Sequence, residues 1–174
     1  MTTALPRPDA AEHAAFYARY IALVPDGDIV ARLRAQGDEL ANALASVSEV
    51  RGGFRYAKGK WTIREVVGHL IDAERIFSYR ALRIARGDAT PLAGFDENAY
   101  VPESGADARP LADLVAELRA VRESTGRLFA SLPSAAWTRT GTASGQPVSV
   151  RALAWITAGH AAHHLGLLRE RYGV

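Results

Sequence analysis

The stretch SVRALAWITAGHAAHHLGLLRERY, residues 149–172, decides the fold, because its apolar residues recur at the three- and four-residue steps of one α-helix. The inward stripe of this helix is apolar except at its middle, where His160 and His164 stand one turn apart. Two imidazoles at this spacing can bind a single metal ion with both side chains unstrained. A third ligand must then come from another helix.

Core packing is the competing interpretation of this pair. A single histidine on an apolar face is more often a core side chain that a carbonyl or a water satisfies. Two on the same stripe strengthen the case for a metal, because each ring brings two nitrogens that need partners in a dry place. From this helix alone the two interpretations stay evenly balanced. The side chain of His163 projects from the helix in a different direction from those of His160 and His164. We therefore expect it behind the site or facing solvent, not as a ligand.

Composition places the chain among ordinary globular proteins. Its 174 residues suit one domain. Hydrophobic residues make up 48% and charged residues 23%, and the predominance of Ala, Leu and Arg is typical of helical proteins. The net charge is +2 without any basic cluster, which argues against nucleic acid as a partner. No cysteine is present, so disulfides, thiolate nucleophiles and Cys-ligated zinc are excluded. Neither a signal sequence nor a membrane span is predicted, and we expect a cytoplasmic protein.

Three further amphipathic helices of about 20 residues are predicted. Each has a start or stop residue: residues 29–47 follow Asp28, residues 63–86 follow Thr62, and residues 111–132 precede Pro133. Thr62 and Glu65 form a capping-box pattern, which makes the second start the best marked.

The remaining segments are expected to connect these helices. They are a short N-terminal helix that begins at Asp9 and is closed by Pro25 and Gly27, a loop over residues 49–60, a long connection over 88–110, and a turn with a short extended piece over 134–147. A connection as long as 88–110 is uncommon unless it covers something. The predicted fold is therefore an all-α four-helix bundle with a short extra N-terminal helix and a long crossover.

His69 is the natural third ligand. It lies at the flank of the inward stripe of the second long helix and is the only other histidine outside the last helix and the N-terminal segment. We expect His13, near the start of the first short helix, at the surface. Asp72 and Glu74 follow on the same helix as His69, and we expect them to form ion pairs with Arg75, Arg80 or Arg169.

Two well-known metal patterns are absent. The ferritin-like di-iron bundle needs Glu-x-x-His on two helices, and the zinc proteases need His-Glu-x-x-His; neither occurs in this chain.

Three separate segments together resemble the DinB-like family of damage-inducible bundle proteins. The first is Gly59–Asp72, which reads GKWTIREVVGHLID; Glu74-Arg75 and Tyr79–Leu82 follow it; the last is Gly159-His160 with His163-His164. The resemblance covers roughly residues 15–172 of a single 1–174 domain. It implies a bundle in which His69, His160 and His164 bind one divalent metal, with water completing the coordination. Zinc or nickel is the leading candidate.

The family is similar in fold to thiol transferases that use bacillithiol or mycothiol, and some members are described as hydrolases. The resemblance thus implies a metal-dependent enzyme, either a thiol S-transferase or a hydrolase, acting on a small electrophile. The thiol would be a co-substrate, since the chain has no cysteine. A homodimer is also expected from the resemblance.

Further candidates surround the predicted site. Tyr56, Trp61 and Arg64 could hold an anionic substrate group, and Asp72 could orient a ligand ring or act as a base. The alternative function is non-catalytic: a bundle stapled by its metal, or a stress-response protein that binds a small molecule. A catalytic site would keep an exchangeable water on the metal, whereas a structural one would be closed.

Overall fold

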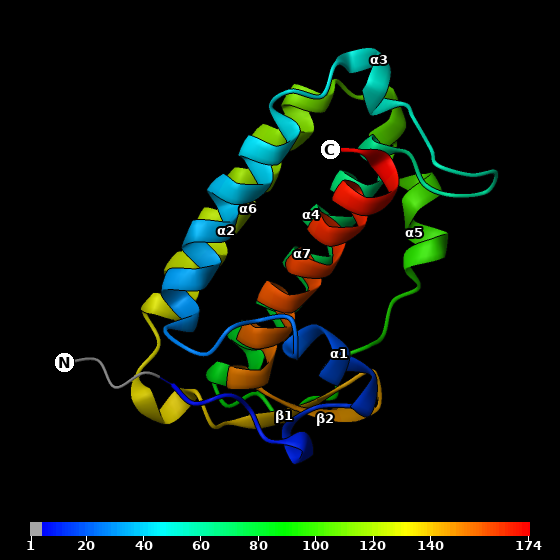
Figure 1. The fold of residues 1–174 in the computed structure, drawn as a ribbon. Helices are drawn as coiled ribbons and strands as arrows, with labels where there is room; N and C mark the ends of the chain where they lie inside the picture. Colours follow the sequence, from blue (N-terminus) through cyan, green and yellow to red (C-terminus); the bar gives the residue numbers. More distant parts are fainter. Residues whose placement is uncertain (1–4) are drawn as a thin grey trace.

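The computed structural model describes residues 5–174 and shows a four-helix bundle with a small β-hairpin at one end (Figure 1). The long helices are α2 (Ile29–Leu44), α4 (Ile63–Ala85), α6 (Leu111–Ala130) and α7 (Val150–Tyr172). All four start where predicted. At three of these starts the side chains of Asp28, Thr62 and Ser149 accept hydrogen bonds from first-turn amides. The predicted fold class is confirmed.

The direction of the helices explains the long crossover. Helices α2 and α4 each pack against both α6 and α7. In Figure 1, α2 and α7 run one way along the bundle, and α4 and α6 run the other way. Because α4 and α6 are parallel neighbours, the chain must return along the whole bundle between them. Residues 86–110 make this return.

Several short elements depart from the sequence-based expectation. The predicted N-terminal helix is divided into η1 (Ala10–Glu12), η2 (Ala15–Tyr17) and α1 (Ala18–Ile21). The predicted loop and connections contain α3 (Glu49–Gly52), α5 (Glu97–Glu103), η3 (Ala106–Ala108) and η4 (Ser134–Ala136). Helix α2 ends at Leu44, not Val47. Elements of three to seven residues are too short to show a hydrophobic period, so the pattern missed them.

The extended piece before α7 is a hairpin of β1 (Thr140–Ala143) and β2 (Gln146–Ser149). The strands pair antiparallel, with Thr140 opposite Ser149 and Ala143 opposite Gln146. Ser144 and Gly145 form the turn, and both have positive φ, at 53° and 73°. This is the backbone of a type I′ turn, whose twist suits a two-residue hairpin.

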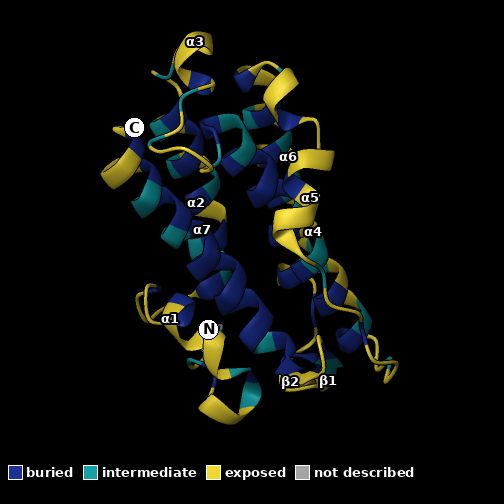
Figure 2. Ribbon diagram, turned by 90° about the vertical axis from the view of Figure 1, so that its right-hand side faces the viewer, coloured by how far each residue is buried: buried dark blue, intermediate teal, exposed yellow. Residues whose placement is uncertain are grey.

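The core has two apolar clusters, one at each half of the bundle. The lower cluster, at the hairpin end in Figure 1, contains Leu33, Phe77, Phe129 and Ile156. The upper cluster, at the other end, contains Leu40, Leu70, Leu118 and Leu165. Figure 2 shows that α7 is buried over most of its length, whereas α5 is largely exposed. Among the helices of residues 5–174, none has both the length and the apolar character needed to cross a bilayer.

Buried polar side chains lie where these two clusters meet. Glu74 of α4 pairs with Arg122 of α6 at 2.7 Å, and both side chains are at most 4% exposed. Arg122 Nη1 donates to Gln36 of α2 at 3.1 Å, and Gln36 Nε2 donates to the carbonyl of Ala158 in α7 at 2.8 Å. This network joins all four long helices, and its α7 member, Ala158, lies two residues before His160.

Candidate metal centre

Three histidines meet near the middle of the bundle, where Phe77 of the lower cluster lies beside His160. His160 and His164 project from α7, and His69 faces them from α4. The Nε2 atoms of His69 and His160 are 3.0 Å apart, and one nitrogen from each of the three rings lies within 4.8 Å of the others. Two imidazoles on one tetrahedral zinc have nitrogens roughly 3.3 Å apart, so the spacing of the first pair suits a shared ion.

Burial keeps these rings neutral. His69, His160 and His164 are 6%, 6% and 7% exposed. Burial lowers the pKa of His69 to about 4, and it holds the pKa of His160 and of His164 well below the usual value for histidine. Each ring therefore offers a lone pair at neutral pH, which is the form that binds a metal.

The surroundings of the cluster are aromatic. Tyr20 and Phe77 meet the His160 ring edge-on, with centroids 5.4 and 5.6 Å away, and Trp61 lies 4.9 Å from the His69 ring. The Nδ1 atom of His164 is fully buried and has no hydrogen-bond partner within residues 5–174. A buried nitrogen without a partner is costly, whereas a metal ion or a water would satisfy this ring. The donor set thus fits one divalent transition metal.

The candidate substrate residues lie at different distances from this cluster. Trp61 contacts the cluster, because its ring packs against that of His69. Tyr56 instead packs edge-on against Tyr172, with centroids 5.1 Å apart. Arg64 donates at 2.7 Å to both the carbonyl and the carboxylate of Glu49, so its charge is used to hold α3.

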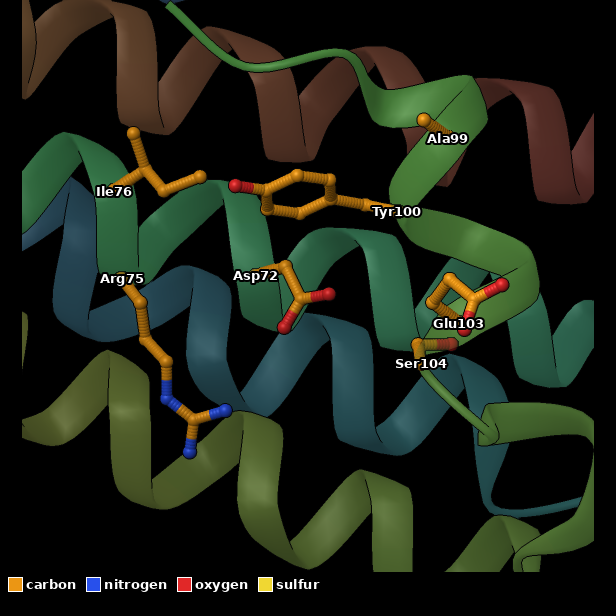
Figure 3. Close-up of a pocket in the computed structure, with 7 residues that line it drawn as sticks. All are labelled: Asp72, Arg75, Ile76, Ala99, Tyr100, Glu103 and Ser104. Carbon is orange, nitrogen blue, oxygen red and sulfur yellow. The ribbon is translucent and has the colours of Figure 1, made fainter. Parts of the chain in front are cut away.

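Asp72 also stands apart from the three rings. It is half-buried, its pKa is raised by burial, and it forms no ion pair within residues 5–174. It lines a cavity of about 650 Å³ between α4 and α5, together with Ile76, Tyr100 and Ser104 (Figure 3). The structure therefore places Asp72 in a neighbouring pocket and brings only the histidines together.

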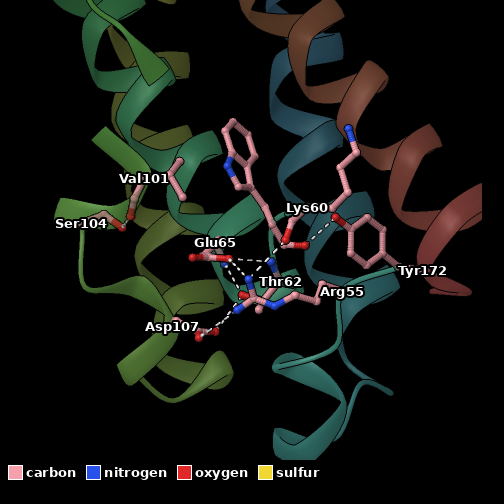
Figure 4. A network of polar contacts seen from close by, with 9 residues as sticks. Arg55, Lys60, Thr62, Glu65, Val101, Ser104, Asp107 and Tyr172 are labelled. Atoms are coloured by element: carbon pink, nitrogen blue, oxygen red, sulfur yellow. Dashed lines mark hydrogen bonds and ion pairs between the residues drawn. The ribbon is translucent and has the colours of Figure 1, made fainter. Parts of the chain in front are cut away.

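A polar network fixes the loop that carries Trp61 (Figure 4). The Tyr172 hydroxyl donates to the Trp61 carbonyl at 2.7 Å. Thr62 accepts from the Glu65 amide and donates to Asp107 of the crossover at 2.8 Å. These contacts tie the segment before α4 to both α7 and η3, and so hold the indole ring over His69.

Three expectations about the other polar residues were wrong. His13 is buried, not at the surface, and its Nδ1 lies 2.9 Å from the Ala14 carbonyl. Glu74 pairs with Arg122, not with Arg75, Arg80 or Arg169, because it faces the core and meets α6. Asp72 does not pair with those arginines either.

Two kinds of residue near the site were missed. Tyr20 and Phe77, whose rings pack against His160, were not identified as neighbours of the site. Gln36 and Arg122 are polar residues that occupy positions within apolar stripes. Gln36, for example, follows Leu33 by three residues and precedes Leu40 by four. Polar residues in such positions were a visible indication of a buried network.

Comparison with known proteins agrees with this architecture. YfiT from Bacillus subtilis, a probable metal-dependent hydrolase with an unusual four-helix bundle topology, has a similar fold, with a TM-score of 0.74 and 17% identity. The match covers 97% of this chain and 94% of that one. No curated protein matches the sequence. The family model of the DinB superfamily matches residues 32–168, and the chain belongs to that superfamily.

Proposed function

We propose that the protein is a metal-dependent enzyme whose single divalent ion is held by His69, His160 and His164. The observation that carries this proposal is the meeting of three neutral, buried imidazoles, one of which has a nitrogen without a partner. Three protein ligands leave one position open, as is typical of catalytic zinc sites. Zinc and nickel are the proposed ions.

Such an ion would supply a Lewis acid that brings the pKa of a bound water or thiol to near neutrality. The protein's own contribution is to orient the ligands and to keep the centre dry. The Gln36–Arg122–Glu74 network and the Thr62 cap fix the helices that carry the rings. Tyr20, Phe77 and Trp61 exclude water from the faces they cover, which strengthens electrostatic interactions there.

Hydrolysis of a small electrophilic substrate is the proposed reaction, in keeping with the description of YfiT. Transfer to a low-molecular-weight thiol is the alternative, with the thiol as a second substrate. Asp72, whose pKa burial raises, is the proposed proton acceptor from the adjoining pocket. Asp72→Asn should lower turnover by roughly 100-fold or more and leave the metal content unchanged.

Elemental analysis of untagged protein tests the metal site. We expect about one divalent ion per chain, and its loss in both His160→Ala and His164→Ala. His163→Ala is the matched control, because it removes an imidazole from the same helix but not from the cluster. Protein that stays metal-free after incubation with zinc or nickel would show that the histidines are core residues.

Cobalt substitution separates catalysis from a structural staple. An exchangeable water on bound cobalt, seen spectroscopically, is expected for the enzyme. A closed coordination sphere would end the catalytic proposal and favour a metal that only joins α4 to α7. Assays of metal-loaded protein with electrophilic substrates, with and without an added thiol, then distinguish hydrolysis from transfer.

A further inference from the structure

A second pocket lies beneath the crossover, beyond the cavity of Figure 3. It has a volume of about 360 Å³ between α4 and residues 90–95, and it shares Ile76 and Tyr100 with that cavity. Its lining contains two arginines, Arg80 and Arg83, and no Asp or Glu. Aromatic rings form much of the remaining wall, from Tyr79, Phe95 and Tyr100.

Arg80 is the unusual member of this lining. It is 3% exposed, yet no carboxylate within residues 5–174 forms an ion pair with it. The other deeply buried arginine, Arg122, is paired with Glu74, as buried charges normally are. Arg83, in the same pocket, is neutralised by Asp88. Arg80 is therefore a buried cation that lacks its anion.

The donors of Arg80 are only partly used. Its Nη2 atom donates to the Ala93 carbonyl at 2.8 Å and to the Ser144 hydroxyl at 3.1 Å. An arginine carries five N–H donors, so those on Nε and Nη1 remain without a protein acceptor in the described chain. Neither of these two Arg80 atoms is completely buried without a hydrogen-bond partner, whereas Nε of Arg122 is. Both atoms thus keep some exposure, and the Arg80 side chain lines the pocket.

We propose that this pocket binds a small organic anion, whose charged group meets Arg80 and whose apolar body lies among the aromatic rings. The bound anion would supply the counter-charge that the protein does not. The Arg80 guanidinium already faces the Phe95 ring, at 5.9 Å, so charge and apolar surface adjoin within the pocket. Pockets of this size, mostly apolar with one convergent charged group, are typical of small-molecule sites.

This pocket is separate from the histidine cluster. Arg80 follows His69 by eleven residues on α4, about 16 Å along the helix axis. The proposal therefore does not depend on the metal, and anion binding can be measured whether or not the metal site is loaded.

The test compares phenylacetate with its neutral isostere phenylacetamide by calorimetric titration of the wild-type protein. We expect saturable binding of phenylacetate, and binding of phenylacetamide that is roughly 10- to 100-fold weaker, as the loss of a charge-assisted hydrogen bond implies. Equal affinity for the two, or no binding of phenylacetate, would overturn the proposal. Binding of inorganic phosphate without phenylacetate would also overturn it, because a bare anion needs no apolar wall.

Variants locate the binding to Arg80. Arg80→Gln should weaken phenylacetate by roughly 10- to 100-fold, whereas Arg86→Gln, the same charge change at the exposed end of α4, should leave it unchanged. Should Arg80→Gln fail to fold, Phe95→Leu keeps the charge and removes the ring. It should weaken phenylacetate severalfold, and unchanged affinity in that variant would contradict the assigned pocket.

Discussion

The Cβ atom that Gly159 lacks would lie 2.1 Å from the carbonyl oxygen of Tyr20. Helix α1 thus approaches α7 at a position that admits only glycine, and the approach sets the Tyr20 ring against His160. Gly159→Ala should force α1 away from α7, because the atom it meets is backbone and cannot rotate aside. We expect a loss of roughly 1–3 kcal/mol in the free energy of unfolding, measured with urea.

Gly166 provides the control for this substitution. It lies on the same helix, but a Cβ there would meet nothing within 4 Å. Gly166→Ala should therefore raise stability by up to about 1 kcal/mol, through helix propensity alone. Equal effects from the two substitutions would show that the contact with Tyr20 does not constrain α7.

The buried pair of Glu74 and Arg122 should be highly sensitive to the loss of one partner. Glu74→Gln leaves the Arg122 charge buried without its carboxylate, and about 3 kcal/mol of unfolding free energy should be lost. The exposed pair of Glu123 and Arg127 is the control, since Glu123→Gln should change stability by less than about 1 kcal/mol. Replacing both Glu74 and Arg122 by apolar residues should restore much of the loss. If the single and double variants are equally unstable, the buried charge is not the cause.

The long helices were predictable because each combines a three- to four-residue apolar period with a start or stop residue, such as the cap Thr62 before α4 or Pro133 after α6. Their parallel and antiparallel arrangement was not, since an inward stripe does not say which helix it will meet. For this reason Arg122 could not be identified as the partner of Glu74. The close contact of Gly159 with Tyr20 is likewise a tertiary feature without any local pattern.

The candidate site follows the same division. Spacing placed His160 and His164 on one face of the last helix, and elimination together with the family resemblance added His69. The structure brings the three rings together. Their role as metal ligands stays a prediction. Arg64 looked available for a substrate, but it is engaged by Glu49. The two residues are fifteen positions apart, and Glu49 belongs to α3, a four-residue helix that is too short to show a hydrophobic period.

Acid should destabilise the metal-free protein. The pKa of His69 falls from 6.5 in the unfolded chain to about 4 in the folded one, because burial disfavours the charged ring. Between these values the unfolded state binds more protons, so stability is full above pH 6.5 and declines as the pH falls toward about 4. The shift corresponds to at most about 3 kcal/mol. Urea unfolding in the presence of a chelator measures this slope, and constant stability across the window would contradict the buried neutral ring.

Zinc should stabilise the folded protein through the histidine cluster. A ligand that binds only the folded state at 100 times its Kd adds about 2.7 kcal/mol. Thermal unfolding of the wild type and of His163→Ala should therefore shift to higher temperature with zinc, whereas His164→Ala should not shift. A shift that persists in His164→Ala would assign the stabilising ion to another place on the protein.

Trp61 should report directly on occupancy, because its ring lies 4.9 Å from that of His69. The other tryptophans, Trp137 and Trp155, belong to the apolar cluster at the hairpin end of the bundle. Cobalt binding should quench the emission of Trp61, since quenching by such an ion falls steeply with distance. Trp61→Phe keeps an aromatic wall over His69 and should retain the metal while losing most of the quenching. If its emission is quenched as strongly as that of the wild type, cobalt is bound nearer to Trp137 or Trp155 than to the three histidines.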